Sequence, residues 1–294
     1  MKKVLFSGAA TALVTPMTKD GLDLPALDRL IEFQLENGIQ ALIICGTTGE
    51  PSTLTADEWK EAIARTVAAV HGRVPVIAGT GSNSTAHVLE LAAIAKELGA
   101  DAQLCVTPYY NKTTQAGLTA HYQKIADESA LPVILYNVPA RTGMGISLDA
   151  LKALAKHDNI LALKEAGGDI GRVADIFACV GDELTIYSGA DEMNVAMMSL
   201  GAMGTISVLS NICPKETAQM AEACLRGDYK KAAALQIRMM PLIRLLFSEV
   251  SPIPVKCALH LMGMTEETLR LPLVPMSAAG CEKLQNEMTR LGLL

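Results

Sequence analysis

The chain has 294 residues, of which 50% are hydrophobic and 19% are charged, so it can bury a full core and is not a disordered protein. Its formal net charge is -6, and its Lys and Arg residues form no cluster, which argues against nucleic acid or an anionic membrane as the main partner. We therefore expect a protein whose ligand is a small molecule.

The N-terminus imitates a signal peptide, because Met1-Lys2-Lys3 precedes an apolar stretch. Ser7-Gly8 interrupts that stretch, which also looks like the first strand of a repeating pattern, so we expect it to stay in the mature protein. No apolar run approaches the roughly 18 residues that a membrane span needs. The seven cysteines are odd in number and scattered, without a C-x-x-C pair, as is typical of a reducing cytoplasm. The sequence predicts a soluble cytoplasmic protein.

Short runs with high β-propensity recur along the chain, and a helical pattern follows each of them. Eight strands are predicted, at Ala9–Thr15, Ala41–Cys45, Val74–Ala78, Ala102–Thr107, Val133–Tyr136, Ile160–Lys164, Leu184–Ser188 and Gly204–Val208. The helices between them have recognisable ends: Thr55 and Glu58, for example, form a capping box. Strict alternation of strand and helix implies a parallel sheet with helices outside.

An open doubly wound sheet would satisfy the alternation, but eight units of similar length favour a closed (β/α)8 TIM barrel in the α/β class. After the last predicted strand only helices follow, at Pro214–Arg226, Tyr229–Phe247, Pro254–Met262 and Ala278–Leu291, with a kink expected at Pro241. We expect a catalytic barrel over residues 1–227 and a C-terminal helical region over residues 228–294.

Polar residues gather at the C-terminal ends of the predicted strands, where a barrel builds its active site. They are Gly46-Thr47-Thr48-Gly49-Glu50, Thr107-Pro108-Tyr109-Tyr110, Tyr136 to Gly143, Lys164 and Ser188-Gly189-Ala190-Asp191. The segment from Tyr136 to Gly143 contains Arg141. Each has an ordinary structural explanation when taken alone: a turn, a packing aromatic or a solvated loop charge. Their convergence on one rim favours a functional site.

Lys164 lies toward the C-terminal end of the apolar run Ile160–Ala166. Apolar neighbours disfavour an ammonium and make a lysine nucleophilic, whereas an isolated lysine at a strand end more often extends to solvent. Alternation along the strand places Glu165 on the opposite face, so it is not the expected ion-pair partner. A desolvated lysine, a tyrosine, a carboxylate cradle and a guanidinium together indicate Schiff-base chemistry on a 2-oxo acid.

Competing motifs are weak. Gly79-Thr80-Gly81 is followed by Ser84, where a dinucleotide fingerprint needs glycine, and there is no Walker loop. The five histidines show no metal-binding spacing, so we expect no metal. Lys256, in the segment Ser251–Lys256, is the rival amine, but it lies at the start of a helix outside the eight-strand pattern.

Four motifs resemble the dihydrodipicolinate synthase family. They are Gly46-Thr47-Thr48-Gly49-Glu50, Val106-Thr107-Pro108-Tyr109-Tyr110-Asn111, Tyr136-Asn137-Val138-Pro139-Ala140-Arg141-Thr142-Gly143 and Lys164-Glu165-Ala166. The similarity runs essentially end to end and includes Ser251–Lys256 and Leu269–Pro272. The order and spacing of the motifs are specific.

The resemblance implies condensation of pyruvate with L-aspartate 4-semialdehyde, a step toward diaminopimelate and lysine, without a cofactor. It implies that Lys164 forms the imine and that Tyr136, Thr48 and Tyr110 form a proton relay, with Tyr110 reaching in from a neighbouring subunit of a homotetramer, a dimer of dimers. Thr47 and Thr48, helped by the backbone at Gly189 and Ile206, would hold the pyruvate carboxylate. Arg141 would orient the relay and meet the carboxylate of the semialdehyde.

Family members that L-lysine inhibits strongly bind it beside the two tyrosines. Here Tyr109 and Asn83 match that site, but Ala56 and Trp59 stand at the histidine positions and His87 stands at the glutamate position. We therefore expect weak inhibition or none.

Two alternatives stay open at this point. One is another pyruvate-dependent lyase on the same barrel, such as an N-acetylneuraminate or sugar-acid aldolase, although Arg141 and the paired Tyr109-Tyr110 favour the synthase. The other is a non-catalytic barrel that binds a small acid or serves as a scaffold.

Overall fold

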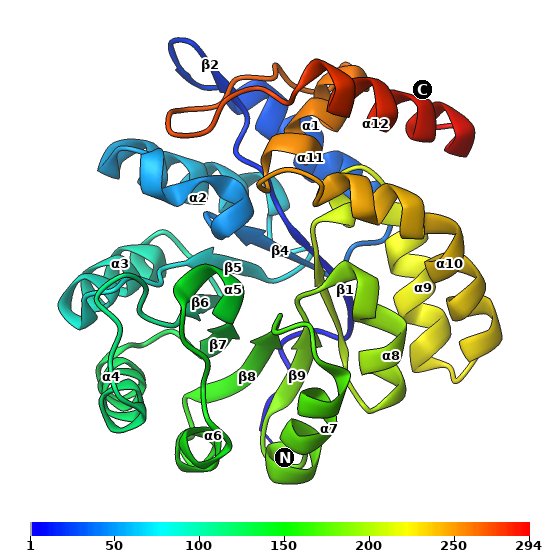
Figure 1. Cartoon of the computed structure of the whole chain (residues 1–294). Helices are drawn as coiled ribbons and strands as arrows, with labels where there is room; N and C mark the ends of the chain where they lie inside the picture. The colour runs from blue at the N-terminus through cyan, green and yellow to red at the C-terminus, as the bar shows by residue number, and fades with distance from the viewer. Residues whose placement is uncertain (1) are drawn as a thin grey trace.

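A closed barrel of parallel strands forms the centre of the molecule (Figure 1), in a computed structural model that describes residues 2–294. Around the barrel the strands follow the order β1-β10-β9-β8-β7-β6-β5-β4. Their bounds are β1 (Gly8–Ala12), β4 (Ala41–Ile44), β5 (Val76–Gly79), β6 (Ala102–Val106), β7 (Val133–Asn137), β8 (Ile160–Glu165), β9 (Thr185–Ser188) and β10 (Gly204–Ser207). The closed barrel confirms the predicted TIM-barrel fold over the open doubly wound sheet.

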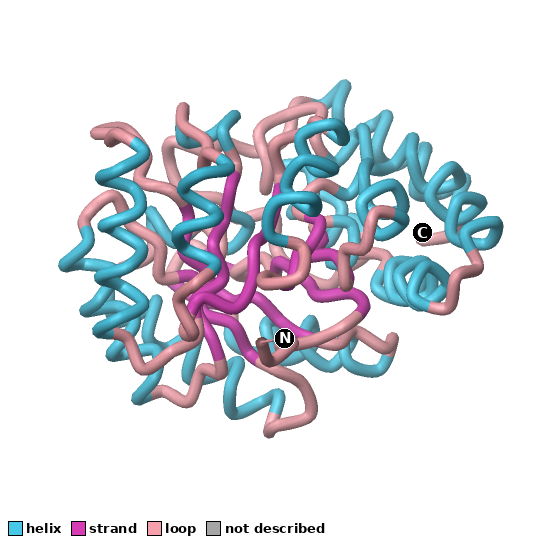
Figure 2. Tube along the Cα trace, turned by 90° about the horizontal axis from the view of Figure 1, so that it is seen from below, coloured by secondary structure: helices cyan, strands magenta, loops and turns pink. Residues whose placement is uncertain are grey.

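Helices surround the barrel, as Figure 2 shows from below. They are α1 (Leu24–Glu36), α2 (Ala56–Val70), α3 (Thr85–Glu97), α4 (Gln115–Glu128), α6 (Leu148–Ala155), α7 (Ile170–Val180), α8 (Asn194–Ser199) and α9 (Pro214–Leu225). The capping box of α2 is confirmed: the Glu58 backbone N–H donates to Thr55 Oγ1 at 3.2 Å, and the Thr55 N–H donates to Glu58 Oε2 at 2.9 Å.

Some element bounds differ from the predictions. β5 begins at Val76 rather than Val74, since Pro75 has no N–H to donate to the ladder, and β1 ends at Ala12 rather than Thr15. The short hairpin of β2 (Met17–Thr18) and β3 (Gly21–Leu22) was not predicted. Neither were the helix α5 (Pro139–Thr142) and the single 3-10 turns η1 (Thr47–Gly49), η2 (Pro51–Thr53), η3 (Asp191–Met193) and η4 (Leu209–Asn211).

Small and aliphatic side chains fill the barrel interior. Its buried cluster includes Ala10, Ala41, Ile43, Ile77, Leu104, Ile134, Tyr136, Ala162, Tyr187 and Ile206. Within the same cluster the Phe6 and Tyr187 rings stack with centroids 4.2 Å apart, and the Tyr187 hydroxyl donates to the Phe6 carbonyl at 2.8 Å. The interior is therefore packed toward the N-terminal ends of the strands, which leaves the opposite end for a site.

The last three helices, α10 (Tyr229–Leu246), α11 (Ile253–Leu261) and α12 (Ala278–Leu291), lie to one side of the barrel (Figure 1). α10 continues through Pro241. The three helices pack around a second apolar cluster, which also takes in Val14 and Leu30. The division at residues 227 and 228 stays a prediction, although Asp228 does cap α10 by accepting a hydrogen bond from the Lys231 N–H at 3.0 Å.

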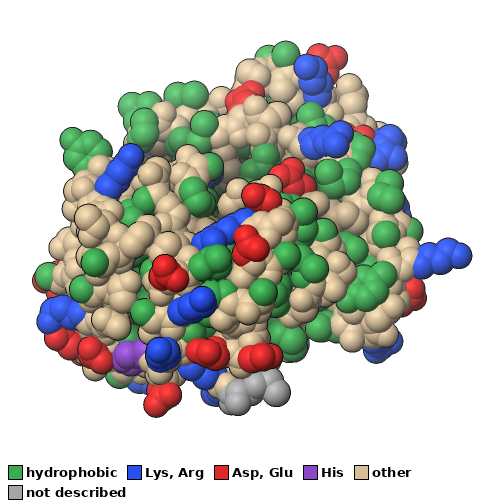
Figure 3. Space-filling view, turned by 60° about the horizontal axis from the view of Figure 1, so that its bottom comes forward, with side chains coloured by type: hydrophobic (Ala, Val, Ile, Leu, Met, Phe, Trp, Pro, Cys, Tyr) green, Lys and Arg blue, Asp and Glu red, His purple; other side chains and the backbone are tan. Residues whose placement is uncertain are grey.

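The surface in Figure 3 carries acidic and basic side chains interspersed with one another. All seven cysteines lie in the described part of the chain and are free thiols. Across residues 2–294, no helix has both the length and the apolar character that crossing a membrane requires.

Candidate active site

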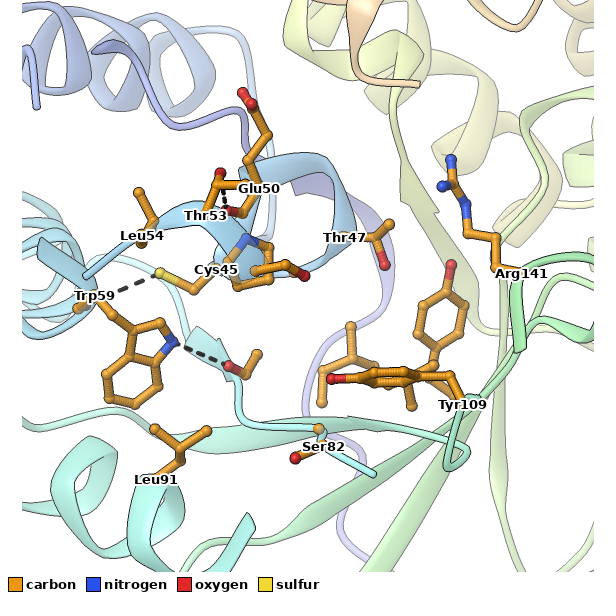
Figure 4. A pocket seen from close by; sticks show the side chains of 18 of the residues that line it. Cys45, Thr47, Glu50, Thr53, Leu54, Trp59, Ser82, Leu91, Tyr109 and Arg141 are labelled. Carbon is orange, nitrogen blue, oxygen red and sulfur yellow. Dashed lines mark hydrogen bonds between the residues drawn. The ribbon is translucent and has the colours of Figure 1, made fainter. Parts of the chain in front are cut away.

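A cavity of about 790 Å³ opens at the C-terminal ends of β4, β5, β6 and β7 (Figure 4). Of the residues singled out from the sequence, its walls include Thr47, Trp59, His87, Tyr109, Tyr136 and Arg141. The structure therefore brings residues from three of the predicted rim segments to one cavity, at the end of the barrel where the sequence predicted the site.

Lys164 and Tyr136 lie side by side on neighbouring strands. They are register partners in the β7–β8 ladder, and the Lys164 ammonium nitrogen lies 4.4 Å from the centroid of the Tyr136 ring. Both side chains are buried, with 6% of each residue exposed. Lys164 is not itself part of the cavity wall, but the Tyr136 ring that it contacts is. The lysine is thus packed within the barrel and is not one that extends to solvent.

Glu165 points to the other face of β8, as its position in the alternation predicts. Its carboxylate accepts two hydrogen bonds from the Asn137 amide, at 2.8 and 3.1 Å, and one from the Gly167 N–H at 2.6 Å. Burial raises the pKa of Glu165, and these hydrogen bonds oppose the rise. Its partners are therefore amides, which leaves Lys164 without a carboxylate from its own strand.

Gly189, which follows β9, packs directly against the Lys164 side chain. A Cβ added at this position would lie 2.9 Å from Lys164 Cε and 3.0 Å from Lys164 Cγ. Only glycine leaves room for the lysine here. Ile206, on β10, is 1% exposed and belongs to the same interior cluster as Tyr136.

Thr47 and Thr48 lie in the 3-10 turn η1 directly after β4. Gly46 precedes the turn with an extended backbone, and the Gly49 N–H closes it by donating to the Gly46 carbonyl at 2.9 Å. Thr47 lines the cavity, whereas Thr48 is buried with 5% exposed and is not among the lining residues. Hydroxyls and backbone N–H groups in such a turn can bind a carboxylate.

Arg141 lies in the short helix α5 after β7, across the cavity from Thr47 (Figure 4). Its Nη2 donates to the Ser251 carbonyl at 3.1 Å, which ties this side of the cavity to the C-terminal helical region. The guanidinium is therefore placed at the rim, where it can meet an anionic substrate.

The two adjacent tyrosines lie differently. Tyr109 is 38% exposed and lines the cavity, whereas Tyr110 is 92% exposed and has a left-handed backbone with φ of 65°. Such a conformation costs energy for a bulky residue and is often retained for function. A single chain leaves Tyr110 outside its own cavity.

Of the residues compared with a lysine-binding site, Ala56, Trp59, His87 and Tyr109 line the same cavity, whereas Asn83 does not. Trp59 is buried, and its indole N–H donates to the Gly79 carbonyl at 3.3 Å. His87 is exposed, and its Nδ1 lies 3.2 Å from Glu90 Oε2. The Asn83 carbonyl accepts a hydrogen bond from the Asn111 amide at 3.0 Å. The cavity thus extends continuously from Tyr136 to Trp59 and His87.

Lys256, the rival amine, has another partner. It is fully buried, and its Nζ lies 2.6 Å from Glu50 Oε1. Burial lowers the pKa of Lys256, while the Glu50 carboxylate opposes that fall. The structure places Lys256 away from the cavity wall. Glu50 and Lys256 each belong to a motif described in the sequence analysis, but nothing in the sequence indicated that the two residues pair.

Within residues 2–294, no three His, Cys, Asp or Glu side chains come together in a way that could hold a metal ion.

Comparisons with known proteins agree along the whole chain. The model of the dihydrodipicolinate synthetase family matches residues 5–291. A 4-hydroxy-tetrahydrodipicolinate synthase of Acetivibrio thermocellus is 48% identical over 294 residues, which covers 100% of each chain.

Two solved structures are close matches. The chloride-inhibited dihydrodipicolinate synthase of Acinetobacter baumannii, complexed with pyruvate, is 43% identical with a TM-score of 0.96, covering 98% of this chain and 99% of that one. The enzyme from Cyanidioschyzon merolae with lysine bound is 38% identical with a TM-score of 0.95, covering 99% of this chain and 100% of that one.

Proposed function

The chain belongs to the dihydrodipicolinate synthase family and is an enzyme with the 4-hydroxy-tetrahydrodipicolinate synthase activity of lysine biosynthesis, and we propose that it works through an imine between Lys164 and pyruvate. The observation that carries this proposal is the buried contact of the Lys164 ammonium with the ring of Tyr136, which lines the cavity. The Acinetobacter baumannii relative complexed with pyruvate supports the choice of first substrate.

The proposed chemistry begins when the Lys164 amine adds to the ketone carbon of pyruvate. Water leaves, and a protonated imine forms. The imine draws electrons from the neighbouring methyl group, so that loss of a methyl proton gives an enamine. The enamine carbon then attacks the aldehyde of L-aspartate 4-semialdehyde, and the aldehyde oxygen takes up a proton. The amino group of the semialdehyde then displaces the Lys164 amine from the imine carbon, which closes the ring and frees the lysine. Every step uses side chains of the protein and the two substrates, so the reaction needs no cofactor.

Proton transfers in this scheme need a relay beside Lys164. Tyr136 is in contact with the lysine, Thr48 lies on the turn after β4, and Tyr110 would come from a neighbouring subunit. We assign these three residues to the relay. The exposure of Tyr110 in a single chain supports its use by a second subunit, in an assembly that we propose to be a homotetramer built as a dimer of dimers.

Substrate carboxylates need their own partners. Thr47 and Thr48, with the backbone at Gly189 and Ile206, are proposed to hold the pyruvate carboxylate. Arg141 is proposed to orient the relay and to bind the carboxylate of the semialdehyde from the opposite rim. The seven free thiols support the proposal that the enzyme works in the cytoplasm.

Steady-state kinetics of an Arg141→Ala variant test the second substrate. We expect the KM for the semialdehyde to rise by about tenfold to a hundredfold, the equivalent of about 1.4 to 2.8 kcal/mol, with a smaller change in the KM for pyruvate. Arg172→Ala is the matched control, because the Arg172 guanidinium also donates to a backbone carbonyl, that of Ile146 at 2.7 Å, but lies outside the wall of this cavity. Unchanged kinetics with both substrates in Arg141→Ala would refute the role proposed for Arg141.

A further inference from the structure

A buried ion pair joins the C-terminal helical region to the turn that carries Thr47 and Thr48. Lys256, on α11, and Glu50, at the end of that turn, are 206 positions apart in the chain, with Nζ and Oε1 2.6 Å apart. Their side chains are 0% and 2% exposed. The catalytic scheme above uses neither residue.

Glu50 is tightly coupled to the position of Thr47. It has a left-handed backbone with φ of 54° and ψ of 42°, between the 3-10 turns η1 and η2. Its backbone N–H donates to the Thr47 carbonyl at 3.2 Å. Glu50 lines the cavity, as Thr47 does, and Figure 4 shows its side chain extending from the same turn as Thr47. A displacement of the Glu50 carboxylate therefore moves the turn.

The hydrogen-bonding capacity of the ion pair is only partly used, which is not expected of a pair that serves stability alone. Glu50 Oε2 is buried and has no hydrogen-bond partner within the described residues. Burial lowers the pKa of Lys256, so the charged pair forms against a cost of desolvation. Well-packed apolar side chains at such positions often give equal or greater stability. The charged pair does, however, impose a fixed geometry on the two segments that it joins.

Other contacts of the C-terminal region reach the same rim. Arg270 donates to Glu58 Oε2 at 2.6 Å and to the Thr53 carbonyl at 2.7 Å. The Ser251 carbonyl accepts from Arg141 on the opposite side of the cavity. The chain from Ser251 to Arg270 therefore contacts both sides of the cavity, and Lys256 is its only fully buried cationic contact among the described residues.

We propose that Lys256 and Glu50 are positioning residues for pyruvate, because their ion pair holds the Thr47-Thr48 turn at the distance from Lys164 at which it binds the substrate carboxylate. This inference rests on the proposed function, in which Lys164 forms the imine and the turn holds the carboxylate. This role is exerted through the turn and requires no contact of either residue with the substrate. Their loss displaces the turn and weakens pyruvate binding, while the chemistry at Lys164 is retained.

The test measures how much pyruvate is needed for half-maximal trapping of the imine by borohydride, in intact enzyme followed by mass spectrometry. The variants are Glu50→Gln, which keeps size and shape, Lys256→Met, which removes the charge, and the double variant. Leu154→Ala is the control for lost stability, because Leu154 is fully buried in α6 and lies away from the cavity wall. Thermal unfolding of every variant is recorded in parallel.

We expect the half-saturating pyruvate concentration to rise about tenfold or more in Lys256→Met, the equivalent of about 1.4 kcal/mol. The maximal trapped fraction should stay at one label per chain. Glu50→Gln should shift in the same direction by less. The double variant should be no worse than Lys256→Met, because residues that act as one unit have non-additive effects. Leu154→Ala should lose thermal stability without a shift in half-saturation.

Three results would overturn the inference: an unchanged half-saturating concentration in folded Glu50→Gln and Lys256→Met, an equal shift in Leu154→Ala, or additive effects in the double variant. If Lys256→Met does not fold, Glu50→Gln alone decides. Failure of the wild-type enzyme to trap pyruvate on Lys164 would instead refute the proposed function, so the two failures are distinguishable.

Discussion

Gly189 has no side chain, and this absence determines where the side chain of Lys164 lies. Its Cα faces the Lys164 side chain so closely that an added Cβ would lie 2.9 Å from Lys164 Cε and from Ala166 Cβ. The lysine is held between this glycine and the Tyr136 ring. Its orientation in the barrel is therefore set by its neighbours on both sides.

Replacement of Gly189 by alanine should displace the Lys164 side chain. Overpacking in a filled interior costs about 1–3 kcal/mol, so we expect the half-saturating pyruvate concentration for borohydride trapping to rise by about tenfold to a hundredfold. Gly145→Ala is the control, since a Cβ there would meet its nearest neighbour, Pro139 Cγ, at an ordinary 3.4 Å. Equal trapping curves for the two variants would show that Gly189 does not position the lysine.

Sensitivity to L-lysine is also decided by single residues. The indole N–H of Trp59 is already bonded to the Gly79 carbonyl, and Lys60 brings a further positive charge to the cavity wall. His87 stands at the position where the family resemblance places a carboxylate for an inhibitor's ammonium, and the bound inhibitor would lose that charge partner. We therefore predict weak inhibition by L-lysine or none.

Initial rates against L-lysine, with both substrates near half-saturation, check this prediction. Strong inhibition at micromolar lysine would contradict it and would point to Glu90, which lines the same cavity, as a substitute carboxylate. A Glu90→Gln variant would then separate that explanation from a site elsewhere.

At the scale of elements, the segment after α11 braces the start of α2. Arg270 pairs with Glu58, the residue that also completes the capping box of α2, and the hydrogen bond from Arg270 lowers the pKa of Glu58 to about 2. The contact therefore joins the C-terminal helical region to the wall of the cavity. Glu58 is the third residue of α2, which follows the turn η2. The contact between Arg270 and Glu58 is therefore close to the rim described above.

The lowered pKa predicts how stability depends on pH. A carboxyl group whose pKa falls on folding stabilises the folded state above its unfolded pKa, about 4.3, and this contribution is lost as pH falls toward about 2. Both side chains keep some solvent contact, so we expect Glu58→Gln to cost about 1–2 kcal/mol at pH 7. The difference in unfolding free energy between wild type and variant should shrink by more than half at pH 3. A pH-independent difference in urea unfolding would contradict this assignment.

Elements with strong local signals were predictable from the sequence, and short ones were not. The capping box of α2 and the apolar runs of β4 and β8 carry their structure in neighbouring residues. The hairpin of β2 and β3 and the four-residue α5 are too short to show a period. The Lys256–Glu50 pair was beyond reach for another reason: it joins residues far apart in the chain, and only the packing of α11 against the barrel brings them together.

At the scale of the whole molecule, one chain does not complete the proposed relay. Tyr110 is 92% exposed with a left-handed backbone, whereas the other relay residues, Tyr136 and Thr48, are buried. The family motif identified Tyr110, but a single chain has no place for it near Lys164. A second subunit is required if Tyr110 takes part in the proton transfers.

Mixed oligomers test this requirement. Tyr110→Phe should reduce turnover by about 10²–10⁴-fold, as expected for a general acid or base, and Lys164→Ala should be inactive while staying folded. Co-expression of the two variants should restore part of the activity, because a mixed dimer contains one site with Lys164 from one subunit and Tyr110 from the other. Co-expression without recovery, or a fully active monomer in sedimentation, would show that Tyr110 does not act across an interface.

The central claim is that Lys164 forms the imine with pyruvate, and the most direct measurement is peptide mapping by mass spectrometry after borohydride reduction in the presence of pyruvate. We predict one pyruvate-derived mass per chain, located on Lys164, and no label in Lys164→Ala. Label on Lys256, or no label in the wild-type enzyme, would contradict the account.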